Sequence, residues 1–234
     1  MRQIPDALML FAAGFGSRMG ALTKDRPKPL LPLAGRALID RALDLADQAG
    51  IERKVVNLHY RGEQIAFHLK HRHDVTLSWE RETILETGGG LRAALPVLGD
   101  GPVYTLNPDA VWAGPNPLTR LRAAWSADDM DGLLLLLPVG SVKGRDGRAD
   151  FLLAKDGRIT RAGNNGQHLY LGAQIISTNA LHEFSEQVFS LNRLWDLMIA
   201  KGRAFGLIYT GHWCDVGTPQ GLQDAVKMLS DHDV

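Results

Sequence analysis

The sequence predicts an α/β fold built on a doubly wound, mostly parallel sheet with a small antiparallel hairpin region. Short apolar runs alternate with stretches of helical periodicity through the first 140 residues, a pattern typical of parallel strands joined by helices. A glycine-rich stretch follows the first apolar run, at the edge where such sheets bind ligands. After residue 140 the runs shorten and are separated by Asp156-Gly157 and Asn165-Gly166, which are hairpin signals.

The first half of the chain is expected to contain five strands and at least three helices. The stretch 37–50 places its apolar residues on one helical face and ends at Gly50, a favourable residue just past a helix end. Residues 61–72 and 117–127 show similar periodicity. The apolar run at 132–139 is far shorter than the ~20 residues that span a bilayer. Strands are expected at Ala7–Ala12, Lys54–Leu58, Val75–Trp79, Val103–Leu106 and Leu133–Pro138.

The second half is expected to add hairpins beside the main sheet and then two or three helices, with a strand at 205–210 between the later ones. The helices are expected around residues 180–187, 191–201 and 219–230. No repeat, low-complexity tract or linker interrupts the sequence. We therefore expect one domain over 1–234 with two functional halves, 1–140 and 141–234.

Composition excludes several classes of partner. Lysine plus arginine and aspartate plus glutamate number 26 each, so the net charge is zero and no basic stripe for a nucleic acid is visible. Cys214 is the single cysteine, which rules out an intramolecular disulfide and fits a reducing compartment. The first ten residues do not resemble a signal peptide. A cytoplasmic protein without nucleic-acid or membrane partners is expected.

The stretch "FAAGFGSRMG", residues 11–20, has the composition of a phosphate-binding loop. A dinucleotide fingerprint needs a third glycine where Met19 stands, and an acidic residue at the end of the second strand, where Asn57 stands. An ATP-hydrolysing P-loop needs Lys and Ser or Thr after its last glycine, but Gly20 is followed by Ala21 and Leu22. Neither of these two loop types fits.

A second cationic element follows at "RPKPLLPLAG", residues 26–35, where Lys28 lies between two prolines. The prolines are expected to keep this segment extended, so that the lysine is held out from the backbone. A proline-rich surface turn with a solvated lysine would explain this segment by itself. Together with Arg18 and the glycines, the pattern favours a site for a phosphate anion.

These two stretches resemble the signature of the sugar-1-phosphate nucleotidyltransferase family, L-A-A-G-x-G-T-R-M followed by P-K-P-L-L-P-V. The resemblance covers nearly the whole chain, since "ETGGGLRAALPVLGD", "LNPDAVW", "GRADF" and "GHWCDVGT" follow in the family's order. The "ETGGG" and "HW-x-DVGT" pieces are most similar to the short uridylyltransferases that act on N-acetylmuramate 1-phosphate in cell-wall sugar salvage. The resemblance implies a Rossmann-like sheet of the nucleotide-diphospho-sugar transferase type, with a nucleotide-binding half at 1–140 and a sugar-binding half at 141–234.

The implied reaction is attack of a sugar 1-phosphate on the α-phosphorus of a nucleoside triphosphate, UTP above all, with pyrophosphate leaving. Such a reaction depends on positioning and charge neutralisation. The resemblance assigns catalysis to Arg18, Lys28 and Asp109, with Arg18 on the β- and γ-phosphates and Lys28 on the α-phosphate. A glucose- or mannose-1-phosphate nucleotidyltransferase and a non-catalytic nucleotide-sugar-binding regulatory protein stay open as alternatives.

The family's two metal-binding aspartates match Asp109 and Asp215, which are 106 positions apart in the chain. Mg²⁺ prefers such carboxylate oxygens together with phosphate oxygens and water. Either aspartate alone could simply belong to a turn. The family usually has glycine before the first aspartate, where this chain has Pro108. Because proline fixes φ, we expect the loop to depart from the glycine path, which puts the direction of the carboxylate in question.

The resemblance also implies the remaining contacts. The "ETGGG" motif is expected to open a helix at "LRAAL" and to lie against the nucleobase. The family branch that acts on glucose 1-phosphate commonly has an E-K-P segment, and "GNNG" in its place favours the muramate branch. Nucleotide contacts are expected from Ala12, Ala13, Gly14, Gly16, Ser17, Arg18, Glu86, Thr87 and Gly88. Sugar contacts are expected from Asn107, Arg148, Asp150, Asn164 and Gly172.

The partners expected are therefore a nucleoside triphosphate and a sugar 1-phosphate, bound by a monomer or small homo-oligomer. Two further features are expected to be structural. His68 and His71 share a helical face without a carboxylate or cysteine to complete a zinc site. Cys214 has no base beside it in its motif and is expected to pack as a small buried residue.

Overall fold

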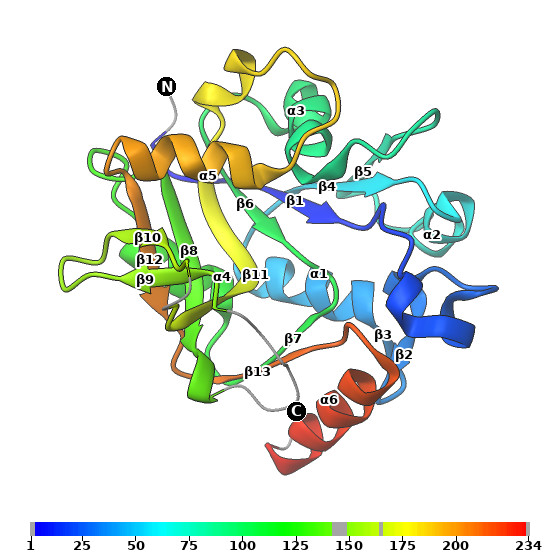
Figure 1. The fold of residues 1–234 in the computed structure, drawn as a ribbon. Coiled ribbons are helices and arrows are strands. Elements are labelled where there is room, and N and C mark those ends of the chain that lie inside the picture. The colour runs from blue at the N-terminus through cyan, green and yellow to red at the C-terminus, as the bar shows by residue number, and fades with distance from the viewer. Residues whose placement is uncertain (1–2, 142–148, 164–165, 233–234) are drawn as a thin grey trace.

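The computed structural model describes residues 3–141, 149–163 and 166–232, whose central feature is one nine-stranded sheet (Figure 1). Its strands run in the order β5-β4-β1-β6-β11-β8-β12, and β9 and β10 extend from β11. The strands are β1 (Ala7–Phe11), β4 (Arg53–Leu58), β5 (Val75–Trp79), β6 (Pro102–Leu106), β8 (Gly132–Pro138), β9 (Phe151–Leu153), β10 (Ile159–Arg161), β11 (His168–Ser177) and β12 (Ala204–Ile208).

The parallel part of the sheet is β5-β4-β1-β6, with β1 at its centre. Leu10 of β1 pairs with Val56 on one side and Leu106 on the other. Leu8, Leu10 and their neighbours are completely buried because helices cover both faces, which explains why these strands appear in the sequence as uninterrupted apolar runs. This confirms the predicted α/β sheet.

The second half of the chain enters the same sheet through β11, which pairs antiparallel with both β6 and β8. The strand expected at Leu133–Pro138 is therefore not a neighbour of the parallel strands that precede it, since β11 lies between β6 and β8. Strand β12 then pairs in parallel with β8. The hairpin of β9 and β10 is the expected antiparallel addition.

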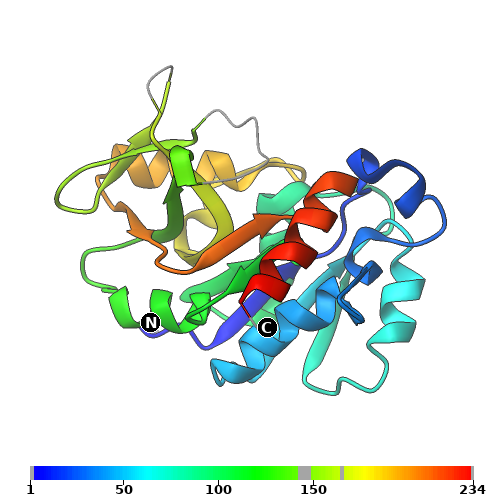
Figure 2. The same ribbon diagram turned by 90° about the horizontal axis from the view of Figure 1, so that it is seen from below.

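Helices cover both faces of the sheet (Figures 1 and 2). Helices α3 and α5 pack on the face that includes Met9, through Leu91 and Leu194. Helices α1 and α4 pack on the opposite face, through Ile39 and Leu118. The helices are α1 (Leu38–Gln48), α2 (Gly62–His68), α3 (Glu86–Leu98), α4 (Pro117–Ala124), α5 (Leu191–Ala200) and α6 (Pro219–Asp231).

Helix α3 begins at Glu86, so the "ETGGG" motif opens this helix, as expected. Glycine has low helical propensity, and the tertiary contacts of these glycines explain why they are helical. One helical expectation needs correction, because the helix expected around 180–187 is a 3-10 helix at Asn179–Glu183.

Helix α6 and a short ribbon complete the fold beside the carboxyl edge of β1. The ribbon consists of β7 (Ala110–Ala113) and β13 (His212–Asp215), which pair antiparallel, with Asp215 opposite Ala110. Helix α6 packs over a cluster that contains Met19 and Val216. A small hairpin of β2 (Pro32–Leu33) and β3 (Arg36–Ala37) precedes α1.

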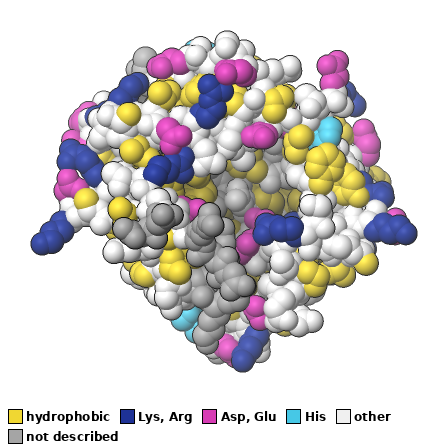
Figure 3. All heavy atoms as spheres, viewed as in Figure 1, with side chains coloured by type: hydrophobic (Ala, Val, Ile, Leu, Met, Phe, Trp, Pro, Cys, Tyr) yellow, Lys and Arg dark blue, Asp and Glu magenta, His cyan; other side chains and the backbone are white. Residues whose placement is uncertain are grey.

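The surface is consistent with the balanced composition. On the face seen in Figure 3, the lysine and arginine side chains are interspersed with aspartate and glutamate, without a stripe of one sign among the described residues. Within the described ranges, every helix is too short or too polar to traverse a bilayer.

Candidate active site

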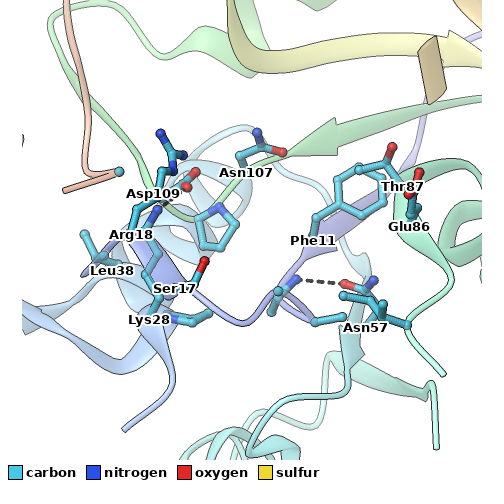
Figure 4. Close-up of a pocket in the computed structure, with 18 residues that line it drawn as sticks. Phe11, Ser17, Arg18, Lys28, Leu38, Asn57, Glu86, Thr87, Asn107 and Asp109 are labelled. Carbon is cyan, nitrogen blue, oxygen red and sulfur yellow. Dashed lines mark hydrogen bonds and ion pairs between the residues drawn. The ribbon is translucent and has the colours of Figure 1, made fainter. Parts of the chain in front are cut away.

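A pocket of about 330 Å³ opens at the carboxyl end of β1 (Figure 4). Its walls come from the loop after β1, the segment around Lys28, the start of α3 and the loop after β6. This is the edge at which doubly wound sheets bind ligands. The lining residues are Phe11, Ala12, Ala13, Gly14, Gly16, Ser17, Arg18, Lys28, Pro29, Leu38, Asn57, Ile84, Glu86, Thr87, Asn107, Pro108, Asp109 and Gly217.

The glycine loop passes through the pocket and turns into a 3-10 helix at Ser17–Thr23. Gly16 has φ of +64°, and a Cβ there would lie 2.9 Å from Lys28 Cβ, so the loop and the lysine segment can approach closely only with glycine. Met19, which stands where the dinucleotide fingerprint has its third glycine, is buried in the cluster beneath α6. A buried methionine thus anchors the loop at the position where the dinucleotide fingerprint has glycine.

Lys28 forms an ion pair with Asp109, with Nζ 2.5 Å from Oδ2. The lysine side chain is 11 % exposed and the aspartate 26 %, so both are partly shielded at the pocket wall. The expected extended conformation holds for Pro27 but is wrong for Lys28, which begins a 3-10 turn over Lys28–Leu30. The expectation failed because proline is tolerated at the start of a helical turn, where its missing N–H would have no partner within the turn, so Pro29 does not prevent Lys28 from beginning one.

Pro108 is compatible with an aspartate directed into the pocket. Asn107 to Ala110 form a turn in which the Ala110 N–H donates to the Asn107 carbonyl at 3.2 Å, and Pro108 occupies the second position, which proline favours. The Asp109 carbonyl accepts a hydrogen bond of 2.9 Å from the Val216 N–H. The turn thus holds Asp109 against the strand that carries the second aspartate.

Asp215 and Arg18 both lie close to Gly217. A Cβ added to Gly217 would stand 2.8 Å from Asp215 Oδ2 and 3.1 Å from each terminal nitrogen of Arg18. Gly217 therefore leaves room for a carboxylate and a guanidinium at the edge of the pocket. The structure brings together Arg18, Lys28, Asp109 and Asp215, although they come from three widely separated parts of the sequence.

These groups fit a magnesium ion bound together with a polyphosphate. Asp109 immediately precedes β7 and Asp215 ends β13, so these two hard oxygen donors lie at the same end of the ribbon, and Lys28 and Arg18 lie beside them. The described parts of the chain contain no group of three or more His, Cys, Asp or Glu suited to a metal ion. Mg²⁺ shared with phosphate oxygens does not need such a group, because it usually takes only one or two protein carboxylates.

The opposite end of the pocket is formed by the start of α3. Glu86 has φ of +58° and lines the pocket with Thr87, whose Oγ1 accepts a hydrogen bond from the Leu191 N–H. Gly88 does not line the pocket: its N–H donates to the Phe189 carbonyl at 2.9 Å, and a Cβ there would lie 2.5 Å from the Phe189 ring. The first glycine of the motif therefore permits close packing of α3 on the 187–189 segment.

The sequence reasoning missed a buried polar chain beneath this end of the pocket. The Ala12 N–H donates to Asn57 Oδ1, Asn57 Nδ2 donates to Glu80 Oε1, and the Leu85 N–H donates to Glu80 Oε2. Asn57 stood out in the sequence only as a departure from the dinucleotide pattern. Glu80 gave no signal, because nothing in its local sequence distinguishes it from a solvated carboxylate.

The expected sugar residues are less closely grouped. Asn107 lines the pocket, and Gly172 packs against it: with φ of +84°, Gly172 lies in an irregularity of β11 where a Cβ would be 3.0 Å from the Asn107 side chain. Asp150 Oδ2 accepts a hydrogen bond from the Tyr170 N–H, away from the residues that line the pocket. Arg148 and Asn164 lie outside the described residues.

Two features singled out in the sequence have structural explanations. Cys214 donates from Sγ to the Gly221 carbonyl, and burial, reinforced by Asp224 and Asp215, raises the pKa of its thiol to about 12. A thiol of this kind is a poor nucleophile at neutral pH. His68 contacts Asp40 through Nε2 at 2.8 Å on the surface of α2.

Comparison with known proteins identifies the family. A model of the MobA-like NTP transferase domain matches residues 8–140, more than half of the chain. This protein belongs to that family. The matched region contains the glycine loop, Lys28, the start of α3 and Asp109, so it supplies nearly all of the pocket.

Relatives of similar length extend the likeness over the whole chain. An N-acetylmuramate α-1-phosphate uridylyltransferase of Caulobacter vibrioides is 38 % identical, with 99 % of this chain and 100 % of that protein covered. A protein of the same name from Neisseria meningitidis is 32 % identical, with 93 % and 95 % covered. Among solved structures, HddC from Yersinia pseudotuberculosis has a TM-score of 0.76 at 20 % identity, with 94 % of this chain and 98 % of HddC covered, which shows the shared fold.

Proposed function

We propose that this member of the MobA-like NTP transferase family transfers a uridylyl group from UTP to N-acetylmuramate 1-phosphate, giving a UDP-sugar and pyrophosphate. The observation that carries the proposal is the pocket itself, because it has two cations and two carboxylates at or beside one end and the start of α3 at the other. The choice of uracil and of the muramate sugar rests on the near-full-length similarity to two uridylyltransferases.

In the proposed reaction a phosphate oxygen of the sugar 1-phosphate attacks the α-phosphorus of UTP. A new P–O bond forms as the bond to the β-phosphate oxygen breaks, and pyrophosphate leaves with its electron pair. Two polyanions must meet, so the main task of the protein is to neutralise and orient them. In this proposal Lys28 contacts the α-phosphate and Arg18 the β- and γ-phosphates, as the resemblance implies.

Mg²⁺ held by Asp109 and Asp215 would stabilise negative charge on the phosphates. Lys28 is paired with Asp109 through Oδ2, so a phosphate that binds the lysine and a metal ion that binds the aspartate would each act on a partner of the same ion pair.

We further propose that the enzyme acts in the cytoplasm, as part of cell-wall sugar salvage and as a monomer or small homo-oligomer. The single cysteine, which allows no intramolecular disulfide, suits a reducing compartment.

The test is a panel assay of pyrophosphate release. Purified protein with Mg²⁺ receives UTP, dTTP, CTP or GTP, each with N-acetylmuramate, N-acetylglucosamine, glucose or mannose 1-phosphate. The proposal predicts the highest kcat/KM for UTP with N-acetylmuramate 1-phosphate, and loss of turnover in EDTA. Preference for glucose or mannose 1-phosphate would show that the protein is a hexose-1-phosphate nucleotidyltransferase instead. Nucleotide binding without turnover of any pair would favour a regulatory protein instead.

A further inference from the structure

Asn57 and Glu80 form a continuous polar connection inside the protein, which we call the Asn57–Glu80 relay. Each of the two residues is 3 % exposed. The Ala12 N–H donates to Asn57 Oδ1 at 2.8 Å, Asn57 Nδ2 donates to Glu80 Oε1 at 2.7 Å, and the Leu85 N–H donates to Glu80 Oε2 at 2.7 Å. Three consecutive hydrogen bonds thus join two backbone amides that are 73 positions apart in the sequence.

The two ends of the relay lie at two different walls of the pocket. Ala12 begins the glycine loop and lines the pocket itself. Leu85 immediately precedes Glu86 and Thr87, which line the pocket at the start of α3 (Figure 4). Glu86 has a positive φ, a conformation that persists only when neighbouring structure holds it. The bond to the Leu85 N–H provides one such constraint directly before the turn.

The backbone of Glu80 is itself fixed. Its N–H donates to the Leu58 carbonyl at 2.9 Å, and its own carbonyl contacts His59 Nδ1 at 2.6 Å. The third glycine of "ETGGG" also belongs to this arrangement, since a Cβ at Gly90 would lie 2.8 Å from Glu80 Oε1 and 3.0 Å from Asn57 Nδ2. Because Gly90 has no side chain, α3 can pack directly over the hydrogen bond between Asn57 and Glu80.

We propose that Asn57 and Glu80 are positioning residues for the nucleotide, which hold the Ala12 loop and the Glu86–Thr87 turn at a fixed separation. The inference rests on the proposed function only in that a nucleotide occupies the pocket. Apolar side chains in the same space would leave the buried amides of Ala12 and Leu85 without acceptors. Apolar contacts would also leave the relative orientation of the two backbone segments undefined, whereas a hydrogen bond restricts both the distance and the alignment of its partners.

The chemistry of the relay allows a sharp test, because exchanging its two functional groups preserves every bond. In the double variant Asn57→Asp with Glu80→Gln, the new carboxylate accepts from the Ala12 N–H and from the new amide group, and the oxygen of that amide accepts from the Leu85 N–H. Each single variant fails. In Asn57→Asp, an oxygen of the new carboxylate faces Glu80 Oε1, so two acceptors oppose each other. In Glu80→Gln, the new NH₂ group faces either Asn57 Nδ2 or the Leu85 N–H, so two donors oppose each other.

The experiment measures the dissociation constant of UTP with Mg²⁺ by calorimetry for the wild type, both single variants and the double variant. Each single variant should weaken UTP binding about 10-fold or more, and the double variant should return to within about 3-fold of the wild type. In steady-state assays the single variants should raise KM for UTP more than they lower kcat, as expected when positioning in the ground state is lost.

Thr178→Val is the matched control. Thr178 is a buried residue whose hydroxyl bonds to the Gly101 carbonyl near the amino end of β6, at the edge of the sheet away from the pocket. This variant should lower Tm without changing the dissociation constant of UTP. Single relay variants that also lower only Tm would reduce the relay to a stabilising contact and overturn the proposal.

Two further outcomes keep the test decisive. Where the single variants do not fold, the double variant decides: failure to fold, or UTP binding more than about 10-fold weaker than the wild type, overturns the relay. Where the wild type itself binds no UTP, the proposed function has failed. Hydrogen exchange of the Ala12 and Leu85 amides then decides, since the relay predicts that they lose protection together in each single variant and regain it in the double.

Discussion

The two ends of the pocket are built on different physical principles. At the phosphate end, Arg18, Lys28 and Asp109 are charged side chains on turns, and Lys28 and Asp109 remain partly exposed. At the α3 end, Asn57 borders the pocket and Glu80 lies behind it; both are buried, and their hydrogen bonds fix backbone segments. Function at the first end depends on charge and at the second on fixed geometry, so substitutions at the two ends should fail in different ways.

The largest effect is expected at the phosphate end, from Asp109→Asn. The change keeps the shape of the side chain but removes a carboxylate that the proposed metal ion requires, so pyrophosphate release should fall about 1,000-fold or more. Tm should change little, because a partly exposed ion pair contributes only about 0–1 kcal/mol. Pyrophosphate assays and thermal melts measure the two effects. Asp100→Asn, at an exposed aspartate after α3, is the control. A normal rate in Asp109→Asn would eliminate the two-aspartate site.

Lys28→Ala should have the next largest effect. Loss of a fixed positive charge at the α-phosphate should raise KM for UTP about 10- to 100-fold, with the fold intact. Lys24→Ala removes an exposed lysine from the same loop and should leave KM near the wild-type value. Initial rates over a range of UTP concentrations distinguish the two variants. Equal KM values for both would remove the role assigned to Lys28.

Two glycine-to-alanine substitutions, each adding one methyl group, should sharpen the contrast between the two ends of the pocket. A Cβ at Gly89 would lie 2.3 Å from the Gln187 carbonyl oxygen, so Gly89→Ala should destabilise the fold by about 1–3 kcal/mol. A Cβ at Gly14 would meet no heavy atom within 4 Å, and Gly14 lines the pocket, so Gly14→Ala should keep its Tm and lose only UTP affinity. Thermal melts and calorimetry measure both properties. Loss of stability in Gly14→Ala with a stable Gly89→Ala would contradict the contrast.

The phosphate end was easier to predict from sequence than the α3 end. Arg18, Lys28 and Asp109 stand in short motifs of charged, glycine and proline residues, and the structure does place them around one pocket. The conformation of Lys28 was predicted incorrectly, because its flanking prolines permit a 3-10 turn as well as an extended segment. The outcome for Pro108 depended on the Asn107–Ala110 turn, which sequence alone does not reveal.

At the α3 end the sequence did not reveal what the glycines contact, and the reason is physical. The predicted approach of "ETGGG" to a base stays a prediction, carried by Glu86 and Thr87 at the pocket, whereas Gly88, Gly89 and Gly90 make room for Phe189, Gln187 and the relay. Such contacts join residues far apart in the chain and follow no local periodicity. The placement of β11 between β6 and β8 has the same origin, since pairing between distant strands is decided by the assembled core. The order and type of most earlier elements were predictable because local patterns specify them.

The ribbon of β7 and β13 has a consequence for how the protein is made. One strand ends at residue 113 and the other begins at residue 212, so the β5-β4-β1-β6 sheet can pair long before the second aspartate leaves the ribosome. Closing so long a loop is a late and slow step compared with local pairing. A nascent chain that still lacks Asp215 also lacks α6, which packs over Met19 of the glycine loop. Synthesis of β13 and α6 would therefore complete both the ribbon and the anchor of that loop.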